Sequence, residues 1–218
     1  MARKFKKSKV SICVFCEGES EQAYIDFLKS EFHDVAVFKR PSSSGLFDDA
    51  DNRFKKDPGY RNYVDAIDEI WFFFDVEEKD IGNWTNRLEI IKRLRKLRKD
   101  PKIRVRLLMT TGCIEYWLML HYRHLAPSLL TVPDKERMLA QVVNMEPTYR
   151  KGNYDATARI AQNYPTAVKN ATIVLQNLLQ EGMPGLEDTD ERNCWLCTKC
   201  KTFSTVQEAI VFLEGLQS

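Results

Sequence analysis

The sequence predicts an α/β fold in which a parallel sheet is flanked by helices and followed by a helical C-terminal region. Short apolar runs rich in β-branched and aromatic residues alternate with segments whose apolar residues recur at helical spacing. The run Ile70–Phe74 is apolar at every position, which is typical of a strand covered on both faces. Such alternation favours parallel strands joined by right-handed crossovers.

The first half of the predicted core contains two strands and a helix. Residues 1–9 are a basic segment that we expect to be a flexible arm, and Val10–Cys16 has the composition of a buried strand. Apolar residues at helical spacing predict a helix from Ser20 to about Glu31, with Ser20 as its N-cap. Asp34–Lys39 is a candidate second strand, and Pro41–Gly45 is a loop signal before a polar, helical stretch.

The second half of the core repeats the alternation. Asp68–Asp75 is predicted to be a strand, and Trp84–Lys99 a helix with basic residues between its apolar positions, ended by Pro101. Arg104–Thr110 follows as a strand and Ile114–Tyr122 as a largely buried helix. We therefore expect residues 10–126 to form the α/β core.

The remainder of the chain, residues 127–218, is predicted to be helical and packed on this core. Candidate helices lie near residues 134–144, 155–180 and 204–216.

Composition excludes several classes of protein. The chain has 218 residues, of which 44% are hydrophobic and 29% charged, and it lacks an apolar run long enough to span a membrane. We expect no membrane association and, since the basic N-terminus lacks a signal-peptide pattern, a cytoplasmic location. The net charge is only +2, so charge alone does not indicate nucleic acid as a partner.

The six cysteines are expected to be reduced thiols rather than a disulfide framework. Cys194, Cys197 and Cys200 have the spacing of metal ligands, but a structural zinc site normally needs a fourth ligand and none lies nearby in the sequence. Zinc at these three residues, with Cys113 or a histidine as fourth ligand, is an alternative that we do not favour.

Carboxylates follow three of the predicted strands at the same end. Glu17 and Glu21 come after the first strand, Asp75 and Glu77 end another, and Glu115 lies just beyond the last. In an open parallel sheet, ligands bind where the loops after the strands converge. Carboxylates after strands are often only solvated loop residues, but five at one sheet edge favour a site for one or two Mg²⁺ or Mn²⁺ ions.

Several segments resemble a known family along nearly the whole chain. Glu17–Glu21 resembles the acidic turn of Toprim domains, especially those of overcoming-lysogenization-defect nucleases and of the RloB-like family, and Trp71–Glu77 resembles the strand that carries the Toprim Asp-x-Asp, with Glu77 in place of the second aspartate. Gly112–His121, Tyr149–Gly152 and Ser204–Thr205 are similar to later RloB-like motifs.

The resemblance implies a Toprim-like sheet and a role in restriction-linked or abortive-infection defence against phage, often beside an ATPase partner. Among the carboxylates that follow the strands, we expect Glu17, Asp75 and Glu77 to hold the principal ion, and Glu21 and Glu115 to help a second ion or to orient water. The implied catalytic residues are Glu17, Asp75, Glu77 and Lys151. Lys151 belongs to the later motif, where its cation would steady a phosphate.

A basic helix face is the candidate surface for nucleic acid. Lys92, Arg93, Lys96 and Lys99 would contact phosphates, and the alternative is an ordinary solvated face. His121 lies on an apolar helix, where packing or a hydrogen bond is favoured over catalysis.

Three functions remain open on the sequence alone. The leading hypothesis is a Mg²⁺- or Mn²⁺-dependent nuclease acting on DNA or RNA. The others are a nucleotidyl or phosphoryl transferase of the Toprim kind, and a module that senses nucleic acid or a partner without turnover.

Overall fold

A four-stranded sheet forms the centre of the computed structural model, which describes residues 9–41 and 45–218. Its strands are β1 (Val10–Cys16), β2 (Ala36–Lys39), β3 (Glu69–Val76) and β4 (Arg104–Thr111), in the spatial order β2-β1-β3-β4. Every neighbouring pair is parallel, so all four carboxyl ends lie at one edge. The fold class is confirmed as a parallel α/β sheet with a helical C-terminal region. The proposed arm lies almost entirely outside the described residues, as do residues 42–44 of the predicted loop.

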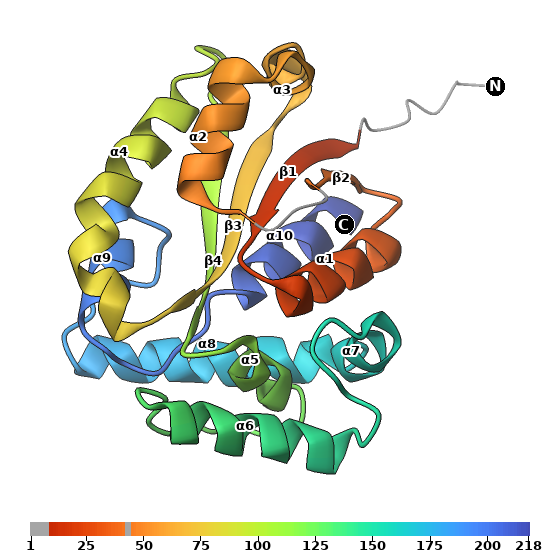
Figure 1. Cartoon of the computed structure of the whole chain (residues 1–218), viewed down its shortest axis with the longest axis vertical. Helices are drawn as coiled ribbons and strands as arrows, with labels where there is room; N and C mark the ends of the chain where they lie inside the picture. The colour runs from red at the N-terminus through yellow and green to blue at the C-terminus, as the bar shows by residue number, and fades with distance from the viewer. Residues whose placement is uncertain (1–8, 42–44) are drawn as a thin grey trace.

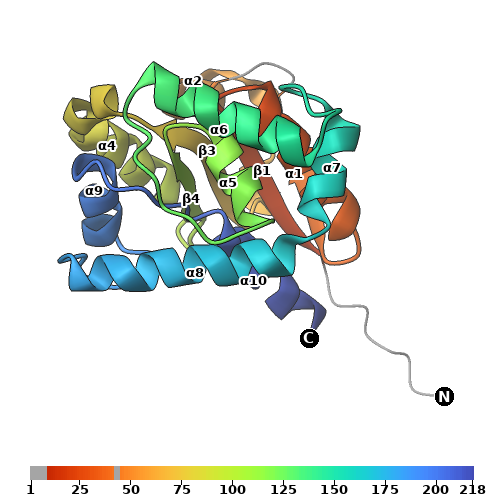
Figure 2. The same cartoon turned by 90° about the horizontal axis from the view of Figure 1, so that it is seen from below.

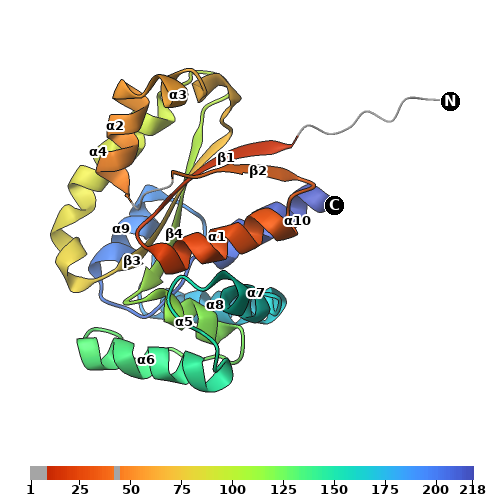
Figure 3. The same cartoon turned by 45° about the vertical axis from the view of Figure 1, so that its right-hand side comes forward.

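Helices cover both faces of the sheet (Figures 1 and 3). The helices of the first half are α1 (Glu19–Glu31), α2 (Phe47–Lys56), α3 (Pro58–Arg61), α4 (Trp84–Arg95) and α5 (Ile114–Leu120), with short 3₁₀ turns at η1 (Val64–Ala66) and η2 (Glu78–Asn83). Those of the second half are α6 (Val132–Met145), α7 (Tyr154–Ala161), α8 (Tyr164–Gln180), α9 (Asp190–Thr198) and α10 (Gln207–Gln217). None of the described helices has the length and apolar content needed to cross a membrane.

Alternate side chains of β3 fill two separate cores. Trp71 and Phe73 pack with α1, α5 and α10, whereas Phe72 and Phe74 pack with α2, α4 and α9. All four side chains are fully buried, which explains why this strand is apolar at every position. Helices α5, α6 and α8 lie below the sheet in Figure 1, and Figure 2, which is seen from below, shows α5 in front of the strands between α6 and α8.

Several predicted boundaries differ from the structure. Helix α1 begins at Glu19 with Gly18 as N-cap, and the Ser20 hydroxyl instead accepts a hydrogen bond from the Gly152 N–H (3.2 Å). Helix α4 ends at Arg95 rather than Lys99, and the Arg98 side chain beyond it donates to backbone carbonyls.

The C-terminal helices also differ from the prediction. The stretch 155–180 is two helices, because α8 starts afresh with Pro165 in its first turn. Helix α9 was not predicted, although Thr189 caps it by accepting from the Arg192 N–H. The last helix starts at Gln207, after a short extended segment.

Candidate metal centre

Glu17 and Asp75 meet where β1 and β3 end. The Glu17 N–H continues the parallel pairing by donating to the Phe73 carbonyl (3.1 Å). The Glu17 carboxylate in turn accepts a hydrogen bond from the Asp75 N–H, with an Oε2 to N distance of 3.0 Å. The two acidic residues are therefore fixed at one edge by the pairing of their strands.

Glu21 lies in the first turn of α1 and folds back toward Gly18. Glu21 is only 4% exposed. A Cβ at position 18 would stand 2.9 Å from Glu21 Oε2, so glycine leaves room for this carboxylate. Burial, together with the charges of Glu17 and Glu115, raises the pKa of Glu21 to about 7, although backbone hydrogen bonds from Glu21 and Gly18 oppose the shift.

Asp75 also has a raised pKa. Burial is the main cause, and the negative charges of Glu21, Glu17, Glu115 and Glu77 add to it, so the pKa of Asp75 is raised well above its usual value. Its Oδ1 atom is buried and has no hydrogen-bond partner among the described residues. A buried carboxylate oxygen of this kind is costly unless a proton or a cation satisfies it.

Glu115 joins the cluster from the first turn of α5. It is 1% exposed and accepts a hydrogen bond from the Tyr149 hydroxyl (3.1 Å). Lys151 follows on the same loop, with its Nζ 3.9 Å from Glu115 Oε1 and its side chain largely exposed. The contact between Gly152 and Ser20 holds this loop against α1.

Two adjoining cavities collect the predicted residues. One, of about 260 Å³, is lined by Glu17, Glu21, Asp75, Glu115 and Lys151. The other, of about 340 Å³, shares Asp75, Glu115 and Lys151 and adds Glu77 and Lys135. The structure therefore brings together all five predicted carboxylates and Lys151.

Glu77 differs from the other four acids in its partners. Its carboxylate forms ion pairs with Lys135 and Lys79. Burial alone would raise the pKa of Glu77, but the hydrogen bonds from these two lysines outweigh it and lower the pKa. Neither lysine was predicted, and Lys135 lies 58 residues away with no local pattern to indicate the pairing.

The residues of the site fit a divalent cation. Carboxylate oxygens are the ligands that Mg²⁺ and Mn²⁺ prefer. A bound ion would give the buried Asp75 Oδ1 the partner that it lacks among the described residues. Within the described ranges, no three His, Cys, Asp or Glu side chains are already placed to hold a metal. The carboxylates would have to turn to bind one.

The match to known families agrees with these motifs. The chain matches the model of RloB-like proteins over residues 12–210. It belongs to the RloB-like family. No curated protein matches the chain. In this RloB-like protein, the Tyr149–Gly152 loop lies beside the carboxylates, and Ser204 and Thr205 pair with β4.

The predicted basic surface is not next to the carboxylates. Helix α4 begins beside the carboxyl end of β3 and runs to the opposite edge of the sheet, so its basic last turn lies away from the site (Figure 1). Arg93 pairs with Asp51 and Lys92 with Glu89. Lys96 and Lys99 are exposed.

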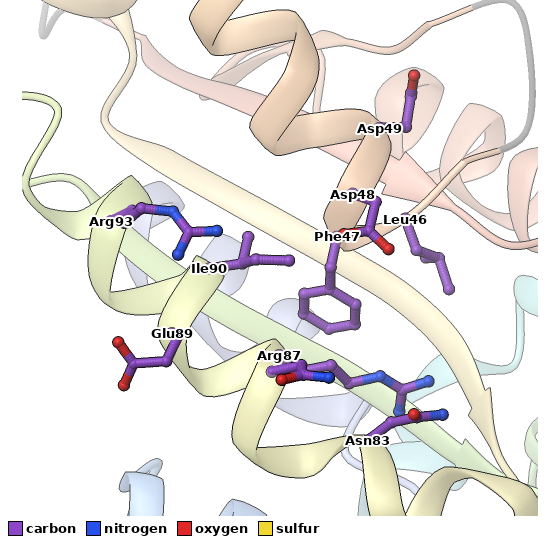
Figure 4. A pocket seen from close by; sticks show the side chains of 10 residues that line it. Leu46, Phe47, Asp48, Asp49, Asn83, Arg87, Glu89, Ile90 and Arg93 are labelled. Atoms are coloured by element: carbon purple, nitrogen blue, oxygen red, sulfur yellow. The ribbon is translucent and has the colours of Figure 1, made fainter.

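A larger cavity of about 550 Å³ lies between α2 and α4, and none of the five carboxylates lines it (Figure 4). Arg87 crosses it beneath Phe47, pairs with Asp80 (2.6 Å) and lies over the rings of Phe47 and Phe74 at 5.2 and 5.0 Å. Arg87 thus joins α4 to the second core of this RloB-like chain.

Cys113 lines the second cavity beside the carboxylates, whereas the C-terminal cysteines and His121 lie apart from them. Cys194 and Cys197 lie on α9, with the Cys197 sulfur 3.5 Å from that of Met109, and the exposed Cys200 follows the helix. His121 is buried and hydrogen-bonds to the Tyr24 hydroxyl (3.2 Å) and the Trp117 carbonyl (3.0 Å). Burial lowers the pKa of His121 to about 4, so it is neutral and structural.

Proposed function

We propose that this RloB-like protein hydrolyses phosphodiester bonds of DNA or RNA with divalent ions, Mg²⁺ or Mn²⁺. The observation that carries the proposal is the buried, unpartnered Asp75 Oδ1 at the meeting point of several carboxylates. Burial and the neighbouring negative charges disfavour the charged forms of Glu21 and Asp75, and a hard cation would offset both effects.

Each residue of the site has a defined part in this proposal. Glu17, Glu21, Asp75 and Glu115 supply oxygen ligands from the turn after β1, from α1, from β3 and from α5. A bound ion would activate water and offset charge on the phosphate. Lys151 reaches the same cavity with an exposed ammonium, which suits it to contact a phosphate oxygen. Hydrolysis adds water to phosphorus and releases the ester oxygen of the cleaved strand.

The test is cleavage of plasmid DNA and of RNA by the purified protein with Mn²⁺ or Mg²⁺. We expect cleavage that chelation abolishes and that Asp75→Asn reduces by about a hundredfold or more, because a metal ligand is lost. Asp65→Asn, an exposed aspartate in η1, is the control and should cleave at the parental rate.

Other outcomes would point to other functions. Turnover of nucleotides without cleavage of polymers would indicate a transferase, and binding without turnover would indicate a sensing module. Either result would contradict the nuclease proposal.

A defence role beside an ATPase is proposed from the family alone. Phage plating on cells that carry the gene with its neighbours tests it. We expect protection that Asp75→Asn abolishes, and equal plating with and without the gene would contradict this role.

A further inference from the structure

Glu77 is the one carboxylate of the site that already has strong cationic partners among the described residues. Lys135 binds its Oε1 and Lys79 binds its Oε2. The side chains of Glu77 and Lys135 are 24% and 25% exposed, whereas that of Lys79 is 66% exposed. Since solvent weakens exposed ion pairs, the pair with Lys135 is the stronger of the two.

Helix α6 holds Lys135 in place. The helix begins with a capping box between Thr131 and Asp134, and Met138, one turn after Lys135, is buried in the same core as α5. Lys135 lies in the first turn, where the helix dipole disfavours a cation. The stability of α6 therefore does not explain a lysine at this position, but the carboxylate of Glu77 does.

Lys135 also faces the space that a substrate would enter. Together with Asp75, Glu77, Glu115 and Lys151, it lines the cavity of about 340 Å³. A divalent ion bound to Glu77 would have to displace one or both ammonium groups from its carboxylate. The geometry points to Lys135 as a built-in cation that replaces a second divalent ion at Glu77, so that the site binds a single ion.

This inference rests on the proposed function and deepens it. The ammonium of Lys135, positioned by Glu77, stabilises the negative charge that develops on the phosphate, as a second metal does in two-metal sites. Removing it should lower kcat by about a hundredfold. Glu77 then acts as a positioning residue for Lys135 rather than as a metal ligand.

The test is the number of Mn²⁺ ions bound per chain, measured by titration calorimetry and by the spin-resonance signal of free Mn²⁺. We expect one ion in the parental protein and in Glu77→Gln, and none in Asp75→Asn at the same concentrations. Lys135→Met should admit a second, weaker ion, and Lys135→Arg, which keeps the charge, should bind one. Lys55→Met removes a lysine that pairs with Asp51 on α2 and is the matched control, with one ion expected.

The outcomes separate this inference from the proposed function. Two ions in the parental protein, one of them lost in Glu77→Gln, would overturn the role of Lys135 but leave metal-dependent hydrolysis standing. A second ion that fails to appear in Lys135→Met, with kcat unchanged, would also overturn it. No bound Mn²⁺ in the parental protein would overturn both proposals.

Discussion

At the residue scale, Glu21 and Asp75 place charge where water cannot solvate it. Burial is the main cause of the raised pKa of each, and the negative charges of the other acids of the site add to it. Because the folded protein favours the protonated form of each, these residues link stability to pH and to divalent ions.

The sign of this linkage gives a prediction for Glu21. Its pKa is about 7 in the folded protein, against an ordinary value of 4.5. Between about pH 4.5 and pH 7, the folded protein therefore binds a proton at Glu21 that the unfolded chain has lost. Without metal, this contribution to the free energy of unfolding is largest below about pH 4.5 and is lost as pH rises through about 7.

Urea unfolding in chelator at about pH 5 and about pH 8 measures the effect, which should be on the order of 2 kcal/mol. Glu21→Gln should remove the part due to Glu21 and the part that arises because the charge of Glu21 raises the pKa of Asp75, and the burial of Asp75 should leave a smaller pH dependence. Glu31→Gln, at an exposed position on the same helix, should leave it unchanged. Mg²⁺ should stabilise the parental protein more at the higher pH. The same pH dependence in Glu21→Gln and the parental protein would contradict this assignment.

At the scale of elements, the loop before α7 is fixed by a close approach to α1. Gly152 has a φ of +74°, and a Cβ there would lie 3.0 Å from the Glu19 side chain. Its N–H also donates to Ser20. The loop that carries Lys151 is therefore positioned by backbone contacts that only glycine permits.

Gly152→Ala should destabilise the protein by about 2 kcal/mol, because it combines an unfavourable φ with a close contact. Gly182 separates the two effects, since its φ is +96° but a Cβ there would meet nothing within 4 Å. Gly182→Ala should cost only about 1 kcal/mol in urea unfolding. An equal decrease in the free energy of unfolding in the two variants would show that the contact with α1 does not constrain the loop.

At the scale of the whole molecule, the carboxylates and the basic end of α4 lie at opposite edges of the sheet (Figure 1). Helix α4 has 12 residues and therefore spans about 18 Å. Only a nucleic acid long enough to cover this span can touch both.

Replacing Lys96 and Lys99 by Ala should lower the slope of log affinity against log salt by about one to two units for a long duplex, because each phosphate contact releases about one counterion. A single-stranded oligonucleotide bound at the carboxylates and too short to reach the end of α4 should show no change, and the saturated cleavage rate should stay constant. Lys29→Ala with Lys169→Ala, on α1 and α8, is the matched control. An unchanged slope on the long duplex would leave this end of α4 as a solvated surface.

The sequence predicted the features of the fold and of the site that depend on local residue patterns and on the direction of the strands. Continuous apolar runs located β1 and β3, and parallel strands bring the acids that follow them to one edge. The sequence did not reveal the pair of Glu77 with Lys135 or the contact of Ser20 with Gly152, because these join residues 58 and 132 positions apart. Ser20 was expected to cap α1 because its type and position suit a cap, but its hydroxyl bonds to the distant loop instead.

The segment before α10 lies along the outer side of β4. Ser204 forms an antiparallel bridge with Thr110, and Thr205 accepts from the Met109 N–H and donates to the Leu107 carbonyl through its hydroxyl. An uncovered edge strand invites pairing with other chains, which leads to aggregation. During synthesis, β4 has no partner on this side until residues 203–205 have been added, so the incomplete chain exposes an edge that can pair with other chains.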